Sequence, residues 1–260
     1  MNVYRVPVGV DTRAPTGETN AYLVGESEAL LVDPPARSDA LDDAVAARDV
    51  AHVAVTHTHA DHVGAVAHYA AETGATVWAR RGREARFERA TGRAPDASLA
   101  GGTRIRTGAG PVTVRDAPGH APDHVAFETA DGVLCGDLAV AEGSVAVGAP
   151  EGDLRAYLTS LRRLHARDPA RLYPGHGPVV TDPRETLSRL VAHRLARERR
   201  VEAAVGGGAR TLDDVLDAAY EKDLAGVRDL ARATVEAHVE KLAVERRVDW
   251  DRANGTVTPR

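Results

Sequence analysis

The chain of 260 residues has few cysteines, few aromatic residues and no long hydrophobic run. Its single cysteine, Cys135, cannot form an intrachain disulfide, and a chain of this length can bury a sufficient core without one. The first residues lack the basic patch and apolar stretch of a secretory signal. Hydrophobic residues make up 43% and charged residues 27% of the chain, as in ordinary globular domains. These features exclude a disulfide-stapled scaffold, give no sign of a membrane span, and favour a folded cytoplasmic protein.

The formal net charge of −5 is too small to indicate a charged partner by itself. One segment stands out, because residues 80–106 contain eight arginines and three acidic residues. This arginine-rich segment could border a binding cleft and favour an anionic substrate. It could equally be an ordinary salt-bridged helix, since Arg80, Glu84 and Glu88 recur at four-residue spacing. The sequence leaves both interpretations open.

The hydrophobic pattern predicts an α/β protein. Apolar runs in 3–9, 20–24 and 28–33, separated by glycine-containing breaks, predict antiparallel strands. From residue 51 strands and helices alternate, with a helix that begins near Asp61 and ends at Gly74. Further expected elements are strands at 51–56, 75–79, 111–116, 124–129 and 132–136, helices at 82–90 and from about Asp153, and a strand near 172.

The C-terminal part has a different character. Helix-forming residues dominate after Pro183, Thr211 is a predicted helix cap, and Asn254-Gly255 predicts a hairpin. Three helices followed by a hairpin suggest a winged helix, so we predict a catalytic domain over 1–183 and a small winged-helix-like domain over 184–260. Residues 185–260 carry 14 basic and 14 acidic residues, which favours a structural cap or a homodimer contact over nucleic-acid recognition.

The chemistry-bearing residues begin directly after the strand at 51–56. His57, His59, Asp61 and His62 lie within six residues, where one loop can turn all four side chains toward a common point. Imidazole and carboxylate ligands suit zinc and other first-row divalent metals. His120, Asp137 and His176 follow later strands, each beside a glycine that permits a tight turn. Together these residues predict a metal site.

In this order the motifs resemble those of the metallo-β-lactamase superfamily, over roughly residues 1–183. The resemblance implies a four-layer αββα sandwich with a dinuclear metal site between two sheets. It implies that His57, His59 and His120 bind one metal, that Asp61, His62 and His176 bind the other, and that Asp137 bridges both. It also places Asp33, in the motif ALLVDPP, beside the ligand loop as a supporting residue.

Residues 150–164 and 172–178, with the predicted C-terminal cap, resemble a β-lactamase-like branch that includes a single-strand-specific endoribonuclease. We therefore expect a hydrolase that holds two zinc ions or other first-row divalent metals, with a metal-bridging hydroxide that Asp61 orients as a catalytic residue. The expected substrate has an ester-type bond, either a small-molecule thioester or the phosphodiester of single-stranded RNA. No membrane partner is expected.

Some alternatives stay open. Certain members of the superfamily oxidise persulfides with a single iron, which here His57, His120 and Asp137 could hold, although the second ligand set would then have no use. His124 is either a substrate-contacting residue or a packing residue at the start of a strand. Cys135 lies two residues before Asp137, so both side chains could point to the same face of a strand. We interpret Cys135 as a buried thiol.

Overall fold

A computed structural model of the chain describes residues 3–221 and 223–260, so the first two residues of the predicted catalytic domain and residue 222 of the C-terminal one lie outside it. The strands are β1 (Val3–Gly9), β2 (Glu18–Val24), β3 (Ala29–Val32), β4 (Val50–Ala54), β5 (Thr76–Arg80), β6 (Ala97–Leu99), β7 (Arg104–Thr107), β8 (Gly110–Asp116), β9 (Val125–Thr129), β10 (Gly132–Gly136), β11 (Leu172–Pro174), β12 (Val248–Asp251) and β13 (Thr256–Pro259). The helices are α1 (Asp39–Ala46), α2 (Ala60–Val63), α3 (Val66–Thr73), α4 (Glu84–Thr91), α5 (Leu154–Arg167), α6 (Pro183–Gly206), α7 (Leu212–Ala219) and α8 (Arg228–Val244).

Two mixed sheets form the body of the molecule. The first has the order β1-β2-β3-β4-β5-β6 and the second the order β11-β10-β9-β8-β7. In the first sheet, β1, β2 and β3 pair antiparallel as predicted, and β3 to β6 pair parallel. In the second sheet only the pair of β10 and β11 is parallel. The predicted α/β class is confirmed.

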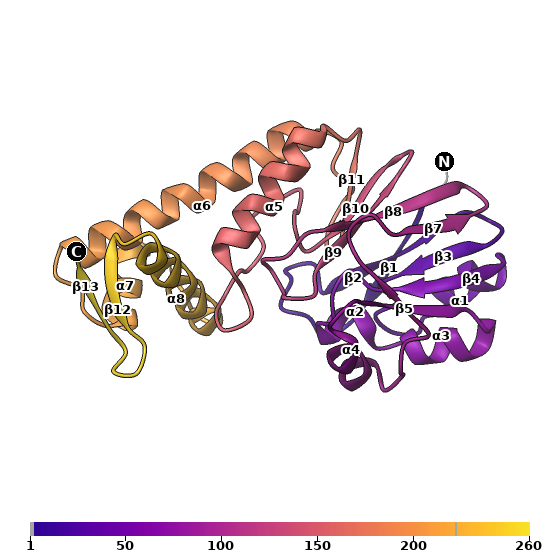
Figure 1. Cartoon of the computed structure of the whole chain (residues 1–260), viewed down its shortest axis with the longest axis horizontal. Coiled ribbons are helices and arrows are strands. Elements are labelled where there is room, and N and C mark those ends of the chain that lie inside the picture. The colour runs from indigo at the N-terminus through magenta and orange to yellow at the C-terminus, as the bar shows by residue number, and fades with distance from the viewer. Residues whose placement is uncertain (1–2, 222) are drawn as a thin grey trace.

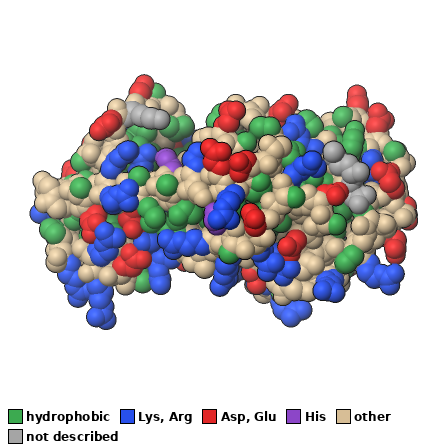
Figure 2. Space-filling view, turned by 90° about the horizontal axis from the view of Figure 1, so that it is seen from above, with side chains coloured by type: hydrophobic (Ala, Val, Ile, Leu, Met, Phe, Trp, Pro, Cys, Tyr) green, Lys and Arg blue, Asp and Glu red, His purple; other side chains and the backbone are tan. Residues whose placement is uncertain are grey.

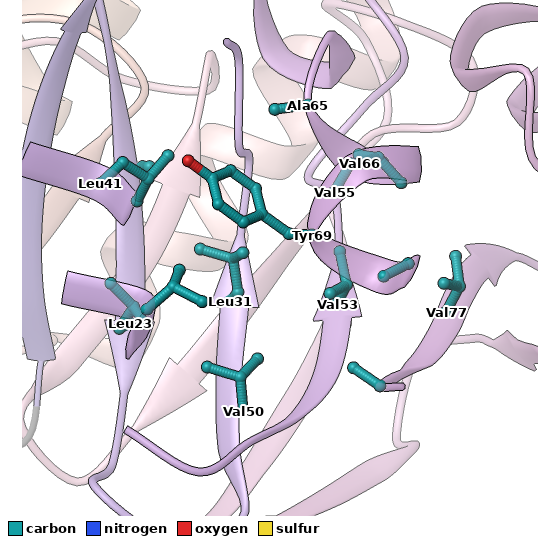
Figure 3. Close-up of a cluster of buried hydrophobic side chains, with 14 of the residues drawn as sticks. Leu23, Leu31, Leu41, Val50, Val53, Val55, Ala65, Val66, Tyr69 and Val77 are labelled. Carbon is teal, nitrogen blue, oxygen red and sulfur yellow. The ribbon is translucent and has the colours of Figure 1, made fainter. Parts of the chain in front are cut away.

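The strand residues alternate between two apolar cores, because successive side chains of a strand point to opposite faces. Leu23, Leu31 and Val53 face outward onto α1 and α3, where the ring of Tyr69 lies at the centre of the cluster (Figure 3). The neighbouring residues Val24 and Leu30 face inward and pack against the second sheet. A third core lies between the outer face of the second sheet and α5 and α6. The layers therefore run helix, sheet, sheet, helix (Figure 1).

The C-terminal elements are three helices and a hairpin, built on the local signals that the sequence contains. Thr211 caps α7 and forms a capping box with Asp214, and the turn between β12 and β13 contains Asn254-Gly255. Helix α6 runs from the second sheet to this C-terminal group (Figure 1). Its first half, with Leu187 and Leu190, packs in the core under α5, and its second half packs against α7 and α8.

The surface carries charges of both signs. Figure 2 shows acidic and basic side chains interspersed over the face that it presents, in keeping with the small net charge. Among the residues that the structure describes, no helix combines the length and the apolar character needed to span a lipid bilayer.

Candidate metal centre

Three histidines meet at the end of β4. His57 Nε2 lies 2.9 Å from His59 Nδ1, which lies 2.9 Å from His120 Nε2. His57 and His59 come from the loop between β4 and α2, whereas His120 comes from the loop before β9. We call His57, His59 and His120 the first cluster. Three ring nitrogens this close together can bind one ion.

A second cluster lies beside the first and consists of Asp61, His62 and His176. His176 Nε2 is 3.5 Å from Asp61 Oδ2. Asp137 lies between the two clusters, since its Oδ2 is 3.4 Å from the Nε2 atoms of both His120 and His176. Its Oδ1 lies 3.6 Å from His62 Nε2. The structure thus brings together all seven residues that the resemblance named as metal ligands.

The outward-facing ring nitrogens of these histidines have partners of their own. Such contacts fix the tautomer and the orientation of a ligating imidazole. The partners are Asp33 Oδ2 for His62 Nδ1 at 3.1 Å, the Ala146 carbonyl for His120 Nδ1 at 2.8 Å, and the Glu18 carbonyl for His176 Nδ1 at 2.8 Å. Each contact directs the Nε2 atom of its ring toward the cluster.

Asp33 is buried and supports the ligand loop from the end of β3. Its carboxylate accepts hydrogen bonds from the backbone N–H of Thr56 at 2.6 Å and from the Thr56 hydroxyl at 2.7 Å, besides contacting His62. Its backbone has φ of 52°, a left-handed conformation that non-glycine residues seldom adopt. The supporting position that the sequence suggested for Asp33 agrees with these contacts.

Asp61 is held by a residue that the sequence did not single out. The Thr12 hydroxyl, from the loop between β1 and β2, donates a hydrogen bond to Asp61 Oδ2 at 2.5 Å. The next residue, Arg13, binds both carboxylate oxygens of Asp229 at 2.9 and 3.1 Å. This loop therefore joins a predicted metal ligand to the beginning of α8.

His124 and Cys135 flank Asp137 from inside the fold. The backbone N–H of Asp137 donates to His124 Nε2 at 3.1 Å, and burial lowers the pKa of His124 to about 3, so the ring stays neutral. Being buried, His124 supports the backbone of Asp137 and has no exposed edge for substrate. Cys135 is a free buried thiol whose pKa burial raises to about 12, in agreement with the sequence interpretation.

A network around Glu151 completes the first cluster. The Glu151 carboxylate lies 3.2 Å from His59 Nε2 and accepts two hydrogen bonds from the Arg86 guanidinium, each of 2.7 Å. Arg86 Nε also donates to the Thr58 hydroxyl at 2.7 Å, and that hydroxyl donates to Asp123 at 2.7 Å. Arg86 belongs to the arginine-rich segment, so one member of that segment reaches the ligand loop.

Other members of the arginine-rich segment are salt-bridged elsewhere. Arg80 pairs with Asp116 at 2.9 Å and Arg93 pairs with Asp96 at 2.9 Å. Arg80 and Glu84 are four residues apart but do not form the helical ion pair that this spacing suggested. Arg80 lies at the end of β5, whereas Glu84 begins α4, so the two residues do not share a helix.

The electrostatics of the site divide its histidines into two kinds. Burial and the neighbouring imidazoles hold the pKa of His57 well below its usual value, and burial lowers that of His120 to about 4. Burial also acts to lower the pKa of His62, but the charges of Asp137 and Asp33 outweigh it and raise this pKa to about 9. Asp137 has a lowered pKa despite its burial, chiefly because His62 is near.

The donor set fits metal ions. His62 Nε2 and Asp137 Oδ1 are both buried, face the cluster and lack a hydrogen-bond partner. They lie 3.6 Å apart, close enough to attract each other as ions but too far for a hydrogen bond. Buried polar atoms without a hydrogen bond are costly, and a cation at this position would satisfy both. Neutral imidazole nitrogens and carboxylate oxygens are ligands that first-row divalent metals accept.

Comparisons with known proteins agree with this geometry. The model of the metallo-beta-lactamase superfamily matches residues 14–176. A thioesterase of Emericella nidulans, pkgB, is 30% identical over 71% of this chain and 53% of its own length, so the chain spans about half of that relative. The Drosophila melanogaster homolog of beta-lactamase-like protein 2 is 29% identical over 87% of this chain and 82% of its own length.

Solved structures show the same fold. A metallo-beta-lactamase family protein from Thermus thermophilus superposes with a TM-score of 0.80 at 23% identity, covering 100% of this chain and 99% of that chain. A beta-lactamase domain protein from Burkholderia ambifaria gives a TM-score of 0.82 at 20% identity, covering 100% of this chain and 91% of that chain. The chain therefore belongs to the metallo-beta-lactamase superfamily, as one of its metal-dependent hydrolases.

Proposed function

We propose that the chain hydrolyses thioesters at a dinuclear metal centre. The observation that carries this proposal is the position of Asp137, whose two carboxylate oxygens face histidines of both clusters. In the proposed arrangement the first cluster would hold one ion, the second cluster would hold the other, and Asp137 would contribute a carboxylate oxygen to each. Two zinc ions are the proposed occupants, with other first-row divalent metals as substitutes.

When bound, a pair of cations supplies an acidified water and a Lewis acid for the scissile bond. The protein residues supply orientation. Asp61 is the proposed catalytic residue, because one carboxylate can ligate a metal and accept a hydrogen bond from the attacking water. Thr12 fixes Asp61 Oδ2 for this task, and Asp33 holds His62 in place.

The thioester is preferred over the alternatives because pkgB and several further relatives are named thioesterases, among them an atrochrysone carboxyl ACP thioesterase of Aspergillus chevalieri. Persulfide oxidation on one iron needs only three ligands, and it would leave Asp61 and His176 without a role although they converge here. Hydrolysis of single-stranded RNA is the second candidate, because residues 150–164 and the C-terminal group resemble the branch that includes an endoribonuclease. We propose that this C-terminal group is a winged-helix-like domain over 184–260.

The test combines metal analysis with four substrates. Purified protein should bind two zinc ions per chain and hydrolyse a glutathione thioester, with less activity on single-stranded RNA, a generic phosphodiester and glutathione persulfide. His59→Ala and Asp137→Ala should abolish hydrolysis and keep the far-ultraviolet circular dichroism spectrum, since apolar cores supply most of the stability. His165→Ala, outside both clusters, is the matched control. Saturation at one ion per chain, or wild-type activity of Asp137→Ala, would refute the dinuclear proposal.

A further inference from the structure

A groove between α5 and α8 lies beside the loop that carries His120. Its volume is about 540 Å³, which is within the range of pockets for small molecules. The two helices are neighbours in Figure 1. The groove is lined by Pro118, Arg155, Arg162 and Arg163, by Lys241 of α8, and by Glu245, which directly follows α8.

The groove has an excess of free positive charge. Arg155, Arg162 and Arg163 are exposed, and none of the hydrogen bonds or ion pairs found among the described residues engages their guanidinium groups. Lys241 is neutralised between Glu198 at 2.7 Å and Glu245 at 2.9 Å. The Asp153 carboxylate, also in the lining, caps α5. The local acidic groups are thus occupied, while the three guanidinium groups are available.

The three arginines share one face of α5. Arg155 and Arg162 are seven residues apart, which corresponds to about 10.5 Å along the helix axis. A single small anion cannot span this distance, whereas a ligand with separated phosphates can. Guanidinium groups bind phosphate through paired charge-assisted hydrogen bonds.

The groove and the metal centre share the His120 loop. The Ser160 hydroxyl donates to the Pro118 carbonyl at 2.8 Å, and the Asp153 N–H donates to the Gly119 carbonyl at 2.8 Å. The lining residue Pro118 thus lies two residues before a proposed metal ligand. A substrate with an anionic end in the groove and a long flexible arm could place its reactive bond at the metals.

We propose that this groove binds the phosphates of a nucleotide-bearing thiol, of which coenzyme A is the representative, and that the metal centre hydrolyses its acyl thioester. This inference rests on the proposed thioesterase function. Water adds to the acyl carbon, the C–S bond breaks, and the thiol leaves with a proton while the acid is released. None of the lining residues is aromatic, which disfavours stacked RNA bases, and the groove is smaller than a protein interface requires.

The first experiment compares three thioesters of one acyl group, carried on coenzyme A, on phosphopantetheine and on N-acetylcysteamine. For the triple variant R155Q/R162Q/R163Q, KM for the coenzyme A thioester should rise about tenfold or more, because each lost phosphate contact weakens binding. KM for the uncharged N-acetylcysteamine thioester and all kcat values should stay within about twofold. The matched control, R171Q/R199Q/R200Q, removes the same charge from exposed positions that lie outside the groove and outside the arginine-rich segment.

The second experiment measures binding of adenosine 3′,5′-bisphosphate to the metal-loaded protein by calorimetry. This probe lacks a thioester, so its result does not depend on hydrolysis. The wild type should bind the bisphosphate, and the variant R155Q/R162Q/R163Q should bind it about tenfold more weakly, whereas the control variant should bind it as the wild type does. This result would support the groove as a phosphate site even if the protein hydrolysed no thioester. The proposal would be overturned if R155Q/R162Q/R163Q changed KM equally for the charged and the uncharged thioesters, or changed KM only for an acyl carrier protein or RNA substrate. It would also be overturned if this variant bound the bisphosphate as tightly as the wild type.

Discussion

At the scale of single residues, the proposed ligand atoms of the metal centre are oriented by contacts on the far side of each histidine ring. Each of His62, His120 and His176 has its Nδ1 on a carboxylate or a carbonyl, so only Nε2 remains for a metal. His59 is the exception, because its Nδ1 faces the cluster and its Nε2 faces Glu151. The orientation of His59 therefore depends on a side chain that Arg86 holds in place.

We predict that Glu151→Gln weakens zinc binding and turnover by about tenfold or more, because outer partners of metal ligands commonly contribute that much. The amide keeps the shape of the carboxylate but loses the ion pair with Arg86. Zinc affinity is measured by competition with a chromogenic chelator, and kcat with the thioester. Arg86→Lys should also lower zinc affinity and kcat.

Glu142→Gln is the control for this prediction, since Glu142 is an exposed glutamate of the same connection. It should match the wild type in both measurements. A Glu151→Gln variant with unchanged zinc affinity would mean that the backbone alone orients His59.

His238 on α8 gives a stability prediction that is independent of the metals. It is fully buried, neither ring nitrogen has a hydrogen-bond partner, and burial lowers its pKa to about 3. Since the unfolded chain protonates near pH 6.5, it binds more protons than the native state between these values. The stability contribution is complete above about pH 6.5 and is lost as the pH falls toward 3.

His238→Leu should therefore reduce the pH dependence of the free energy of unfolding by up to about 1.4 kcal/mol per pH unit below pH 6. Urea titrations of the variant and the wild type at each pH measure the difference between their free energies of unfolding. Any loss of metals at low pH affects both proteins alike and therefore cancels in this difference. His165→Leu removes a histidine that solvent reaches and serves as the control. Parallel curves for wild type and His238→Leu would contradict the assignment.

Sequence reasoning could find the proposed ligands and one of their partners, Asp33, but not the partners Thr12 and Glu151. His57, His59, Asp61 and His62 are local in the chain, and each later ligand follows a strand and adjoins a glycine. Glu151 and His59 are 92 residues apart, and nothing in either local sequence signals the contact. Thr12 and Asp61, 49 residues apart, are a second such pair.

At the scale of elements, the predicted strands and helices differ from the structure mainly where tertiary contacts interrupt a local pattern. The helix predicted from Asp61 to Gly74 is divided into α2 and α3. Gly64, at the break, approaches Pro35 so closely that a Cβ would lie 2.3 Å from the Pro35 carbonyl oxygen. The strands β6 and β7 were not predicted, since four or fewer strand residues give little periodicity. Helix α1, of eight residues, was not predicted either.

The loop carrying His120 depends on its contact with the first turn of α5. Gly119 has φ of 134°, and a Cβ there would lie 2.2 Å from the Tyr157 backbone nitrogen. We predict that Gly119→Ala destabilises the protein by about 2–5 kcal/mol through overlap and backbone strain. It should also displace His120 and reduce zinc occupancy. Urea unfolding and elemental analysis measure the two effects.

Gly208→Ala separates these causes. Gly208 also has a positive φ, 108°, but no heavy atom lies within 4 Å of its ideal Cβ position. This variant should show only the cost of strain, about 1–3 kcal/mol, with normal zinc content. If Gly119→Ala behaved like Gly208→Ala, the packing of the loop on α5 would not hold His120 in place.

For the whole molecule, the decisive element is α6, because it contributes to two hydrophobic cores. Leu187 and Leu190 belong to the core under the second sheet, and Val201 and Val205 belong to the C-terminal core. The domain boundary predicted at residue 183 coincides with the first residue of this helix. The amino-acid composition does change at this residue. The continuous helix α6 nevertheless packs in the cores of both proposed domains, so we expect the two domains to unfold together.

We therefore predict a single cooperative unfolding transition for the wild type, with equal calorimetric and van't Hoff enthalpies. Ala196→Pro, placed in α6 between the two cores, should divide this transition into two, because proline in a helix interior costs about 3 kcal/mol and breaks the hydrogen-bond ladder. Ala196→Gly keeps the backbone N–H and costs only about 1 kcal/mol, so it should lower the midpoint and keep one transition. Differential scanning calorimetry distinguishes these outcomes. Two transitions in the wild type would show that α6 does not couple the cores, and one transition in Ala196→Pro would show that the remaining contacts between α5 and α8 suffice.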